Sequence, residues 1–347
     1  MKKYFIILAA AAMAVCSCAK NSVAVDPDEI FDGTEKYAIT FGSNLRNIST
    51  KSIGSVDAWQ NGMDLYVYGV ERNENVLDLQ NGILINNVKA TVNAGAIEVF
   101  DPQHTSGNIP FYYDYTKKYD FFGYYVDDAA DPSTATPTSL QVHINGTQDI
   151  LLASASRTEA VSGTTIDPNK LFSAYSVRKG ITPNLKFQHM LSRLKFVVIN
   201  GNGAAAEQLP ELRIDTLCVT SPAYATLCPV GDQSLTVNSN SVPEKFYLMN
   251  GTQEIAPYLV IGSGQIGESI MVMPGQEEYE LMFRLVQAGN PVKVEQTEII
   301  KIPGGAVAGK SYTVNLTVYN LQTVAITIEL TPWDSATDPI DIGADED

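Results

Sequence analysis

The chain has 347 residues, a formal net charge of −16 and 17 tyrosines. Binding to a phosphate backbone requires clustered lysine and arginine, and the sequence has no basic stretch interleaved with aromatic residues. The composition therefore argues against nucleic acid as a partner and indicates an acidic, soluble surface. A chain of this length exceeds what one small hydrophobic core needs, which favours two domains of ordinary size.

The amino-terminal residues are typical of an export signal. Two lysines precede an apolar run, residues 4–15, that is too short to span a bilayer as a permanent helix. Cys18 follows a serine, one of the small residues that a lipoprotein signal peptidase requires before the cysteine, whereas Cys16 follows a β-branched valine. We therefore predict a lipoprotein signal peptide over residues 1–17 and a lipidated amino terminus at Cys18, which would attach the chain to the outer membrane. Ordinary secretory cleavage nearby is the alternative.

The rest of the chain divides by composition into a tether and two strand-rich regions. Residues 18–36 are acidic and turn-rich with little periodicity, and we expect a tether there. Composition shifts again near residues 173–184, so we place an N-terminal β-sandwich at 37–182 and a C-terminal β-sandwich at 183–347, which ends in an acidic tail.

Runs of alternating apolar residues, bounded by Gly, Pro, Asn and Asp, recur through both regions. Few stretches sustain the helical period of 3.6 residues over three turns. The predicted fold class is therefore all-β, with sandwich architecture. The clearest strand patterns are MDLYVYGV at 63–70, YDFFGYYV at 119–126, LKFVVING at 194–201, ESIMVMPG at 268–275 and SYTVNLTV at 311–318.

Cys218 and Cys228 flank the segment LCVTSPAYATLC, which we predict to be a hairpin centred on Ala223. A hairpin would place the two cysteines opposite each other, and a disulfide between them could persist in an exported protein. Two free cysteines, packed as small hydrophobic side chains, are the alternative.

Residues Gly262 to Gly267 satisfy the pattern GxGxxG, which can mark a dinucleotide site. Such a site needs a helix to begin at the third glycine, but here a strand-like run follows and reaches Pro274. We predict a β-hairpin turn instead.

Catalytic and metal-binding patterns are absent from the sequence. The three histidines, His104, His143 and His189, are not in a metal-ligand spacing, and no two carboxylates are linked to one cleft. His189 lies among apolar residues, which favours a hydrogen-bonded structural histidine. The acidic tail matches no calcium loop, so a solvated end is expected. We predict no enzymatic activity, no cofactor and no metal.

The order of several segments resembles the fimbrillin family of Bacteroidales, the lipoproteins that build type V pili. The resemblance covers most of the chain after the leader. It implies two tandem transthyretin-like β-sandwiches, a place in a cell-surface fimbria and other fimbrial subunits as partners. The segments that carry it are ITFGS at 39–43 with a TK pair at 50–51, LYVYG at 65–69, YDFFGYYV at 119–126, FQHMLSRLKFVV at 187–198, MVMPG at 271–275, AGKSYTVNLTV at 308–318 and TPW at 331–333.

The resemblance also implies an assembly route. In that family a trypsin-like protease cuts after an arginine near the first strand, and the exposed groove accepts the C-terminal strand of a neighbouring subunit. The matching cut here lies between Arg46 and Asn47, although Arg46 could equally be a plain surface residue. The expected donor strand, residues 323–330, carries its apolar side chains on one face, and an integral edge strand of the second sandwich is the alternative. The side chains of that face are Val324, Ile326, Ile328 and Leu330.

The resemblance leaves open whether the subunit forms the stalk, the tip or the anchor, and whether it contacts host or bacterial surface ligands. A surface glycan-binding lipoprotein is the alternative from another class, because tyrosine rings can stack on sugars. Six tyrosines lie in strand-like runs, however, and alternation would send about half of them into the core. They are Tyr112, Tyr113, Tyr115, Tyr119, Tyr124 and Tyr125.

Overall fold

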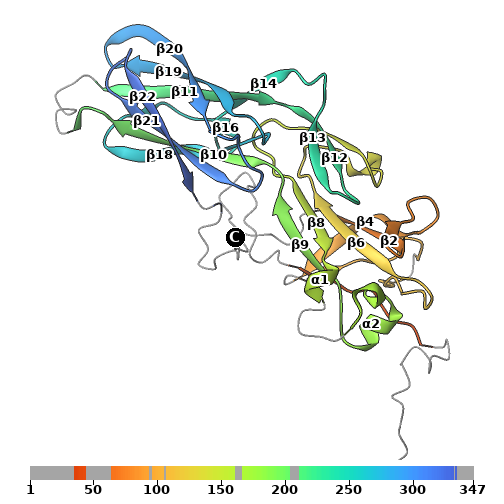
Figure 1. Ribbon diagram of the computed structural model, residues 1–347. Coiled ribbons are helices and arrows are strands. Elements are labelled where there is room, and N and C mark those ends of the chain that lie inside the picture. Colours follow the sequence, from red (N-terminus) through yellow and green to blue (C-terminus); the bar gives the residue numbers. More distant parts are fainter. Residues whose placement is uncertain are drawn as a thin grey trace, which may run out of the picture. The chain divides into compact units, whose positions relative to one another are not determined.

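Figure 1 shows the computed structural model, which describes residues 35–43, 64–93, 96–104, 107–160, 166–203, 211–331 and 333. One compact unit begins at Lys36. Its regular structure is almost entirely β-strand, which confirms the all-β prediction. The short helices of the described residues are α1 (Arg157–Ala160), α2 (Ala174–Arg178) and the 3-10 turns η3 (Pro132–Thr134) and η4 (Pro168–Lys170).

The largest sheet has eight strands and combines chain segments from both sides of residue 182. Its order is β1 (Gly42–Ser43), β9 (Asn184–His189), β8 (Leu151–Ala155), β6 (Tyr119–Tyr125), β2 (Leu65–Asn73), β4 (Ile83–Asn93) and β5 (Ala96–Glu98), with β3 (Val76–Leu77) paired to β2.

The remaining strands form four further sheets. A four-stranded sheet has the order β18 (Ser263–Val272), β10 (Ser192–Asn200), β21 (Ser311–Val318) and β22 (Val324–Thr331). A five-stranded sheet has the order β14 (Pro243–Tyr247), β11 (Leu212–Pro222), β19 (Glu278–Gln287) and β20 (Asn290–Lys301), with β17 (Tyr258–Leu259) beside β11. The small sheets are β13 (Ser234–Val237), β12 (Tyr224–Cys228) and β7 (Leu140–His143), and the pair β15 (Met249–Asn250) and β16 (Gln253–Glu254).

Several strand pairs connect the two predicted sandwich regions. β9 follows the expected boundary at 182/183 but pairs with β8, and β7 precedes the boundary but pairs with β12. The division into two domains stays a prediction.

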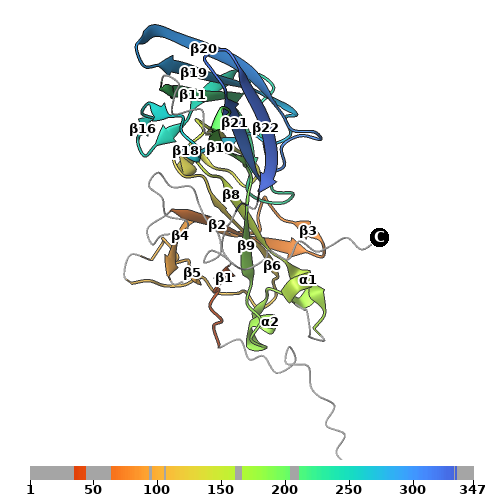
Figure 2. The ribbon, with the colours of Figure 1, turned by 90° about the vertical axis from the view of Figure 1, so that its left-hand side faces the viewer.

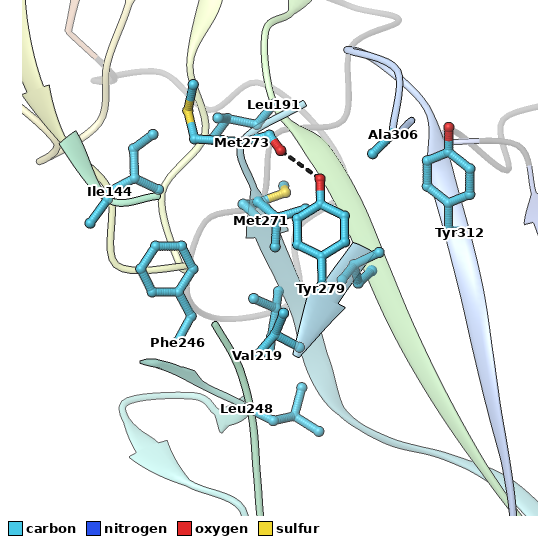
Figure 3. Close-up of a cluster of buried hydrophobic side chains, with 14 of the residues drawn as sticks. Ile144, Leu191, Val219, Phe246, Leu248, Met271, Met273, Tyr279, Ala306 and Tyr312 are labelled. Atoms are coloured by element: carbon cyan, nitrogen blue, oxygen red, sulfur yellow. Dashed lines mark hydrogen bonds between the residues drawn. The ribbon is translucent and has the colours of Figure 1, made fainter. Parts of the chain in front are cut away.

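Two hydrophobic clusters fill the compact unit. The smaller cluster surrounds Phe121 and belongs to the eight-stranded sheet. The larger cluster joins side chains from β2 and β6 to side chains from β10, β11, β19 and β21. Figure 3 shows its centre, where the buried hydroxyl of Tyr279 donates a hydrogen bond of 2.6 Å to the carbonyl oxygen of Met273.

Two local predictions are wrong. β11 and β12 belong to different sheets, so no hairpin joins Cys218 to Cys228. The glycine pattern at 262–267 is also not a hairpin turn, because β18 begins at Ser263 and pairs with β10 from there on. The strand that was expected instead of a nucleotide-binding helix is confirmed.

No helix within the described ranges is long and apolar enough to cross a membrane.

Candidate functional site

The amino-terminal segment 37–43 fills part of the smaller cluster. Ile39 and Phe41 are only 2% and 4% exposed, whereas Thr40 between them is exposed, as expected for a strand with one buried face. The ring of Phe41 packs edge-on against Phe121, with 5.1 Å between ring centroids. The segment therefore contributes two large side chains to this core.

The backbone of the segment is held by a few dispersed hydrogen bonds. The amide of Ile39 donates to the carbonyl of Phe111 at 2.8 Å, and the carbonyl of Tyr37 accepts from the amide of Tyr113 at 3.0 Å. Regular pairing is limited to the two residues of β1, which run parallel to β9. Side-chain burial, more than a backbone ladder, keeps this segment in place.

The predicted processing and lipidation positions, Cys18, Arg46 and Asn47, lie outside the described residues. Arg46 follows the end of β1 at Ser43 by three positions in the sequence.

The predicted donor strand is β22, which forms the edge of the four-stranded sheet (Figures 1 and 2). It pairs antiparallel with β21 along its whole length, from Val324 to Thr331. Leu330 is 66% exposed. The three preceding apolar positions of the same face are half-buried against the larger cluster, and they are Val324, Ile326 and Ile328. β22 thus completes its own sheet here, and its role as a donor stays a prediction.

A polar and aromatic cluster surrounds Trp333, just beyond the end of β22. Trp333 is 6% exposed, and its ring stacks on the ring of His189 with 4.1 Å between centroids. The Nδ1 atom of His189 lies 2.8 Å from the buried carboxylate of Asp149. The prediction of a hydrogen-bonded structural histidine is confirmed.

Arg193 completes this cluster from the start of β10. Its guanidinium lies 4.6 Å from the centre of the Trp333 ring and donates a hydrogen bond to the backbone carbonyl of the same residue. Its Nε donates to the hydroxyl of Ser311 at 3.1 Å. Sequence reasoning identified His189 but neither Arg193 nor Trp333 as its neighbours, because nothing in the local pattern shows which distant residues meet.

Both described cysteines are free thiols. Cys218 is buried on β11, where burial raises its pKa to about 11. Cys228 is half-buried on β12, and its thiol donates to the carbonyl of Val230 at 3.2 Å.

The other two histidines lie at the surface. His104 contacts Asp101 at 3.1 Å, and His143 contacts Glu244 at 3.1 Å while stacking on Tyr224. Within the described ranges, no three or more His, Cys, Asp or Glu side chains are grouped so as to hold a metal ion.

The tyrosines of the strand-like runs do not form an exposed platform, as the alternation predicted. Tyr112 and Tyr115 are partly exposed. The other four are buried, and they are Tyr113, Tyr119, Tyr124 and Tyr125.

A model of the fimbrillin-like family matches residues 50–333. The chain belongs to this family. No curated protein matches it. The match spans both strand-rich regions of this fimbrillin-like protein, from before β2 to Trp333, and it confirms the resemblance found in the sequence.

Solved structures from Bacteroides and Porphyromonas species are similar to the fimbrillin-like chain. A candidate cell adhesion protein from Bacteroides uniformis is 14% identical, with a TM-score of 0.50 and coverage of 86% of this chain and 98% of that one. The fimbrial anchor protein Mfa2 from Porphyromonas gingivalis is 9% identical, with a TM-score of 0.37 and coverage of 86% and 98%. The first similarity shows the fold alone, and the second, at its lower score, supports no conclusion about this chain.

Proposed function

We propose that the protein is a subunit of a cell-surface fimbria, exported as an outer-membrane lipoprotein and assembled with other fimbrial subunits by strand exchange. Membership of the fimbrillin-like family supports a structural role in a fimbria or in adhesion and not an enzymatic one. The observation that carries the exchange step is the burial of Ile39 and Phe41, which lie shortly before Arg46.

Cleavage after Arg46 would separate the segment 37–43 from the rest of the chain. Its loss would expose the apolar surface around Phe121 and leave the edge of β9 without β1. Unpaired backbone groups beside an apolar groove are what an added strand can complete. The occupied positions of the groove, Ile39 and Phe41, are spaced by two residues, as are the apolar positions of β22.

The test is Arg-specific proteolysis of the chain without residues 1–18, followed by amino-terminal sequencing and an unboiled detergent gel. We expect one cut, between Arg46 and Asn47, and a ladder of stable multimers. The matched control is Arg46→Lys, which keeps the charge but removes the cleavage site, and it should remain monomeric.

A second arm tests the donor. A synthetic peptide of residues 323–331 should cap the cut chain and suppress the ladder, whereas a scrambled peptide of the same composition should not. A ladder that forms unchanged in the presence of the peptide would remove β22 as the donor.

The remaining outcomes separate the subunit classes. A cut chain that stays monomeric would be a tip or an anchor subunit, and one that also binds the peptide would be a tip subunit, which accepts a strand without needing to donate one. Resistance at Arg46 would contradict the strand-exchange proposal and favour the glycan-binding alternative.

A further inference from the structure

β22 ends beside a cluster of side chains that come from several distant elements. Asp149 precedes β8, His189 ends β9, Arg193 lies near the start of β10, and Ser311 begins β21. Trp333 follows β22 and contacts His189 and Arg193 directly. The end of β22 is therefore attached to the chain segment that leads from the eight-stranded sheet into the four-stranded one.

The contacts of this cluster depend on one another. Asp149 holds the imidazole of His189 by a 2.8 Å contact to Nδ1. The hydroxyl of Ser311 holds Arg193, because it accepts a hydrogen bond from Nε. Trp333 supplies Arg193 with both an aromatic face and a carbonyl acceptor. Removing the indole would abolish the cation–π contact with Arg193 and the ring stack on His189, and it would leave a cavity in the buried cluster.

The rest of β22 is held less specifically. It is an edge strand, its inward side chains are only half-buried, and Leu330 near its end is exposed. Thr331 adds weak contacts of 3.3 Å and 3.5 Å to Ser311. Edge strands with little buried side-chain surface open locally at low free energy, so the contacts at the end of β22 should govern its release.

We propose that Trp333, held by His189 and Arg193, is a latch that keeps β22 in its own sheet and that must open before the strand can leave. The inference rests on the proposed function for its biological meaning, because a latched β22 is a donor that is not yet available. Trp333 is a positioning residue in this scheme, since it would not enter the acceptor groove with the alternating side chains of β22.

The test is amide hydrogen exchange, measured by mass spectrometry on the full chain without residues 1–18. We expect Trp333→Ala to accelerate exchange of the β22 amides at least about tenfold, as for the loss of one ring stack and one cation–π contact. Trp333→Phe, which keeps a ring, should accelerate exchange less. The matched control is Leu330→Ala, which truncates an exposed side chain at the same end of β22 and should exchange as the unmodified chain does.

The amides of β11 and β19 provide the internal reference, because these strands lie in another sheet. Equal β22 exchange in Trp333→Ala and the unmodified chain would overturn the proposal. Acceleration throughout, including β11 and β19, would overturn it as well, because Trp333 would then stabilise the whole fold and not β22 selectively.

Cleavage after Arg46 separates this inference from the proposed function. The Trp333→Ala chain should form multimers faster than the unmodified chain after the cut. If neither forms multimers, strand donation fails as a function, whereas the exchange rates of the β22 amides still decide whether the latch exists.

Discussion

The two cysteines provide a test at the scale of single residues. Burial raises the pKa of Cys218 to about 11, so at pH 8 almost all of this thiol stays protonated and unreactive. Cys228 is half-buried and more accessible. We expect iodoacetamide at pH 8 to modify Cys228 in the folded chain without residues 1–18, to spare Cys218, and to modify both after unfolding, as counted by mass spectrometry.

The control for this labelling is Cys228→Ser, which should take up no label while folded. Raising the pH toward the pKa of Cys218 should increase its labelling only gradually, because burial also restricts access. Two equivalents of label that appear only after reduction would instead demonstrate a disulfide and contradict the structure.

At the scale of elements, the segment 37–43 should be stabilised mainly by its two buried side chains. Replacing Phe41 by alanine removes the edge-on contact with Phe121 and leaves a cavity, so the free energy of unfolding should fall by about 3–5 kcal/mol. Urea titration followed by circular dichroism measures the loss. The matched control is Thr40→Ala on the exposed face of the same segment, where a change below about 0.5 kcal/mol is expected.

Equal effects of the two substitutions would show that the segment is not packed as the structure has it. A large loss for Phe41→Ala alone would show that Phe41 is packed in the core, which the proposed opening of an apolar groove requires.

Individual strands were predictable from the sequence, but their partners were not. The apolar and aromatic runs at 65–70 and 119–125 correctly marked β2 and β6, which are buried at nearly every position because their side chains enter both hydrophobic clusters. The hairpin around Ala223 failed because the carbonyl of this buried residue accepts from the amide of Ile144, which turns the chain toward β7 and a different sheet. Local turn residues cannot reveal such a distant partner.

In the candidate site, too, some features could be predicted from the sequence and others could not. The sequence indicated that His189 is structural and that β22 has an apolar face, since both follow from neighbouring residues. The contact of Trp333 with His189 and Arg193 could not be foreseen, because it depends on how β22 is registered against β21. Predicting that this face is only half-buried would also have required the sheet order, because the order places β22 at an edge.

At the scale of the whole molecule, the larger cluster should couple the two predicted sandwich regions. Gly146 lies against Phe246 of this cluster with φ +93°, and a Cβ atom there would meet the Cβ of Phe246 at 2.6 Å. Gly146→Ala should therefore lower the free energy of unfolding by about 1–3 kcal/mol more than Gly231→Ala, whose φ is +84° but which has open space around it.

Scanning calorimetry measures the loss of stability and shows whether it affects both regions. We expect one transition in the unmodified chain and in both variants, with the midpoint of the Gly146→Ala chain lowest. Two transitions, only one of them moved by Gly146→Ala, would show that the regions unfold independently and would contradict the coupling.

The short parallel pairing of β1 with β9 bears on whether assembly could be undone. Hydrogen bonds between parallel strands are slanted and slightly weaker per residue than those between antiparallel strands, and β1 contributes only two residues. A strand that entered this edge in the opposite direction, over more residues, would bind more firmly than the one it replaced. In a fimbria built by the proposed exchange, each joint would then be effectively irreversible, and the fibre's length would be set by the supply of subunits and not by an equilibrium at its ends.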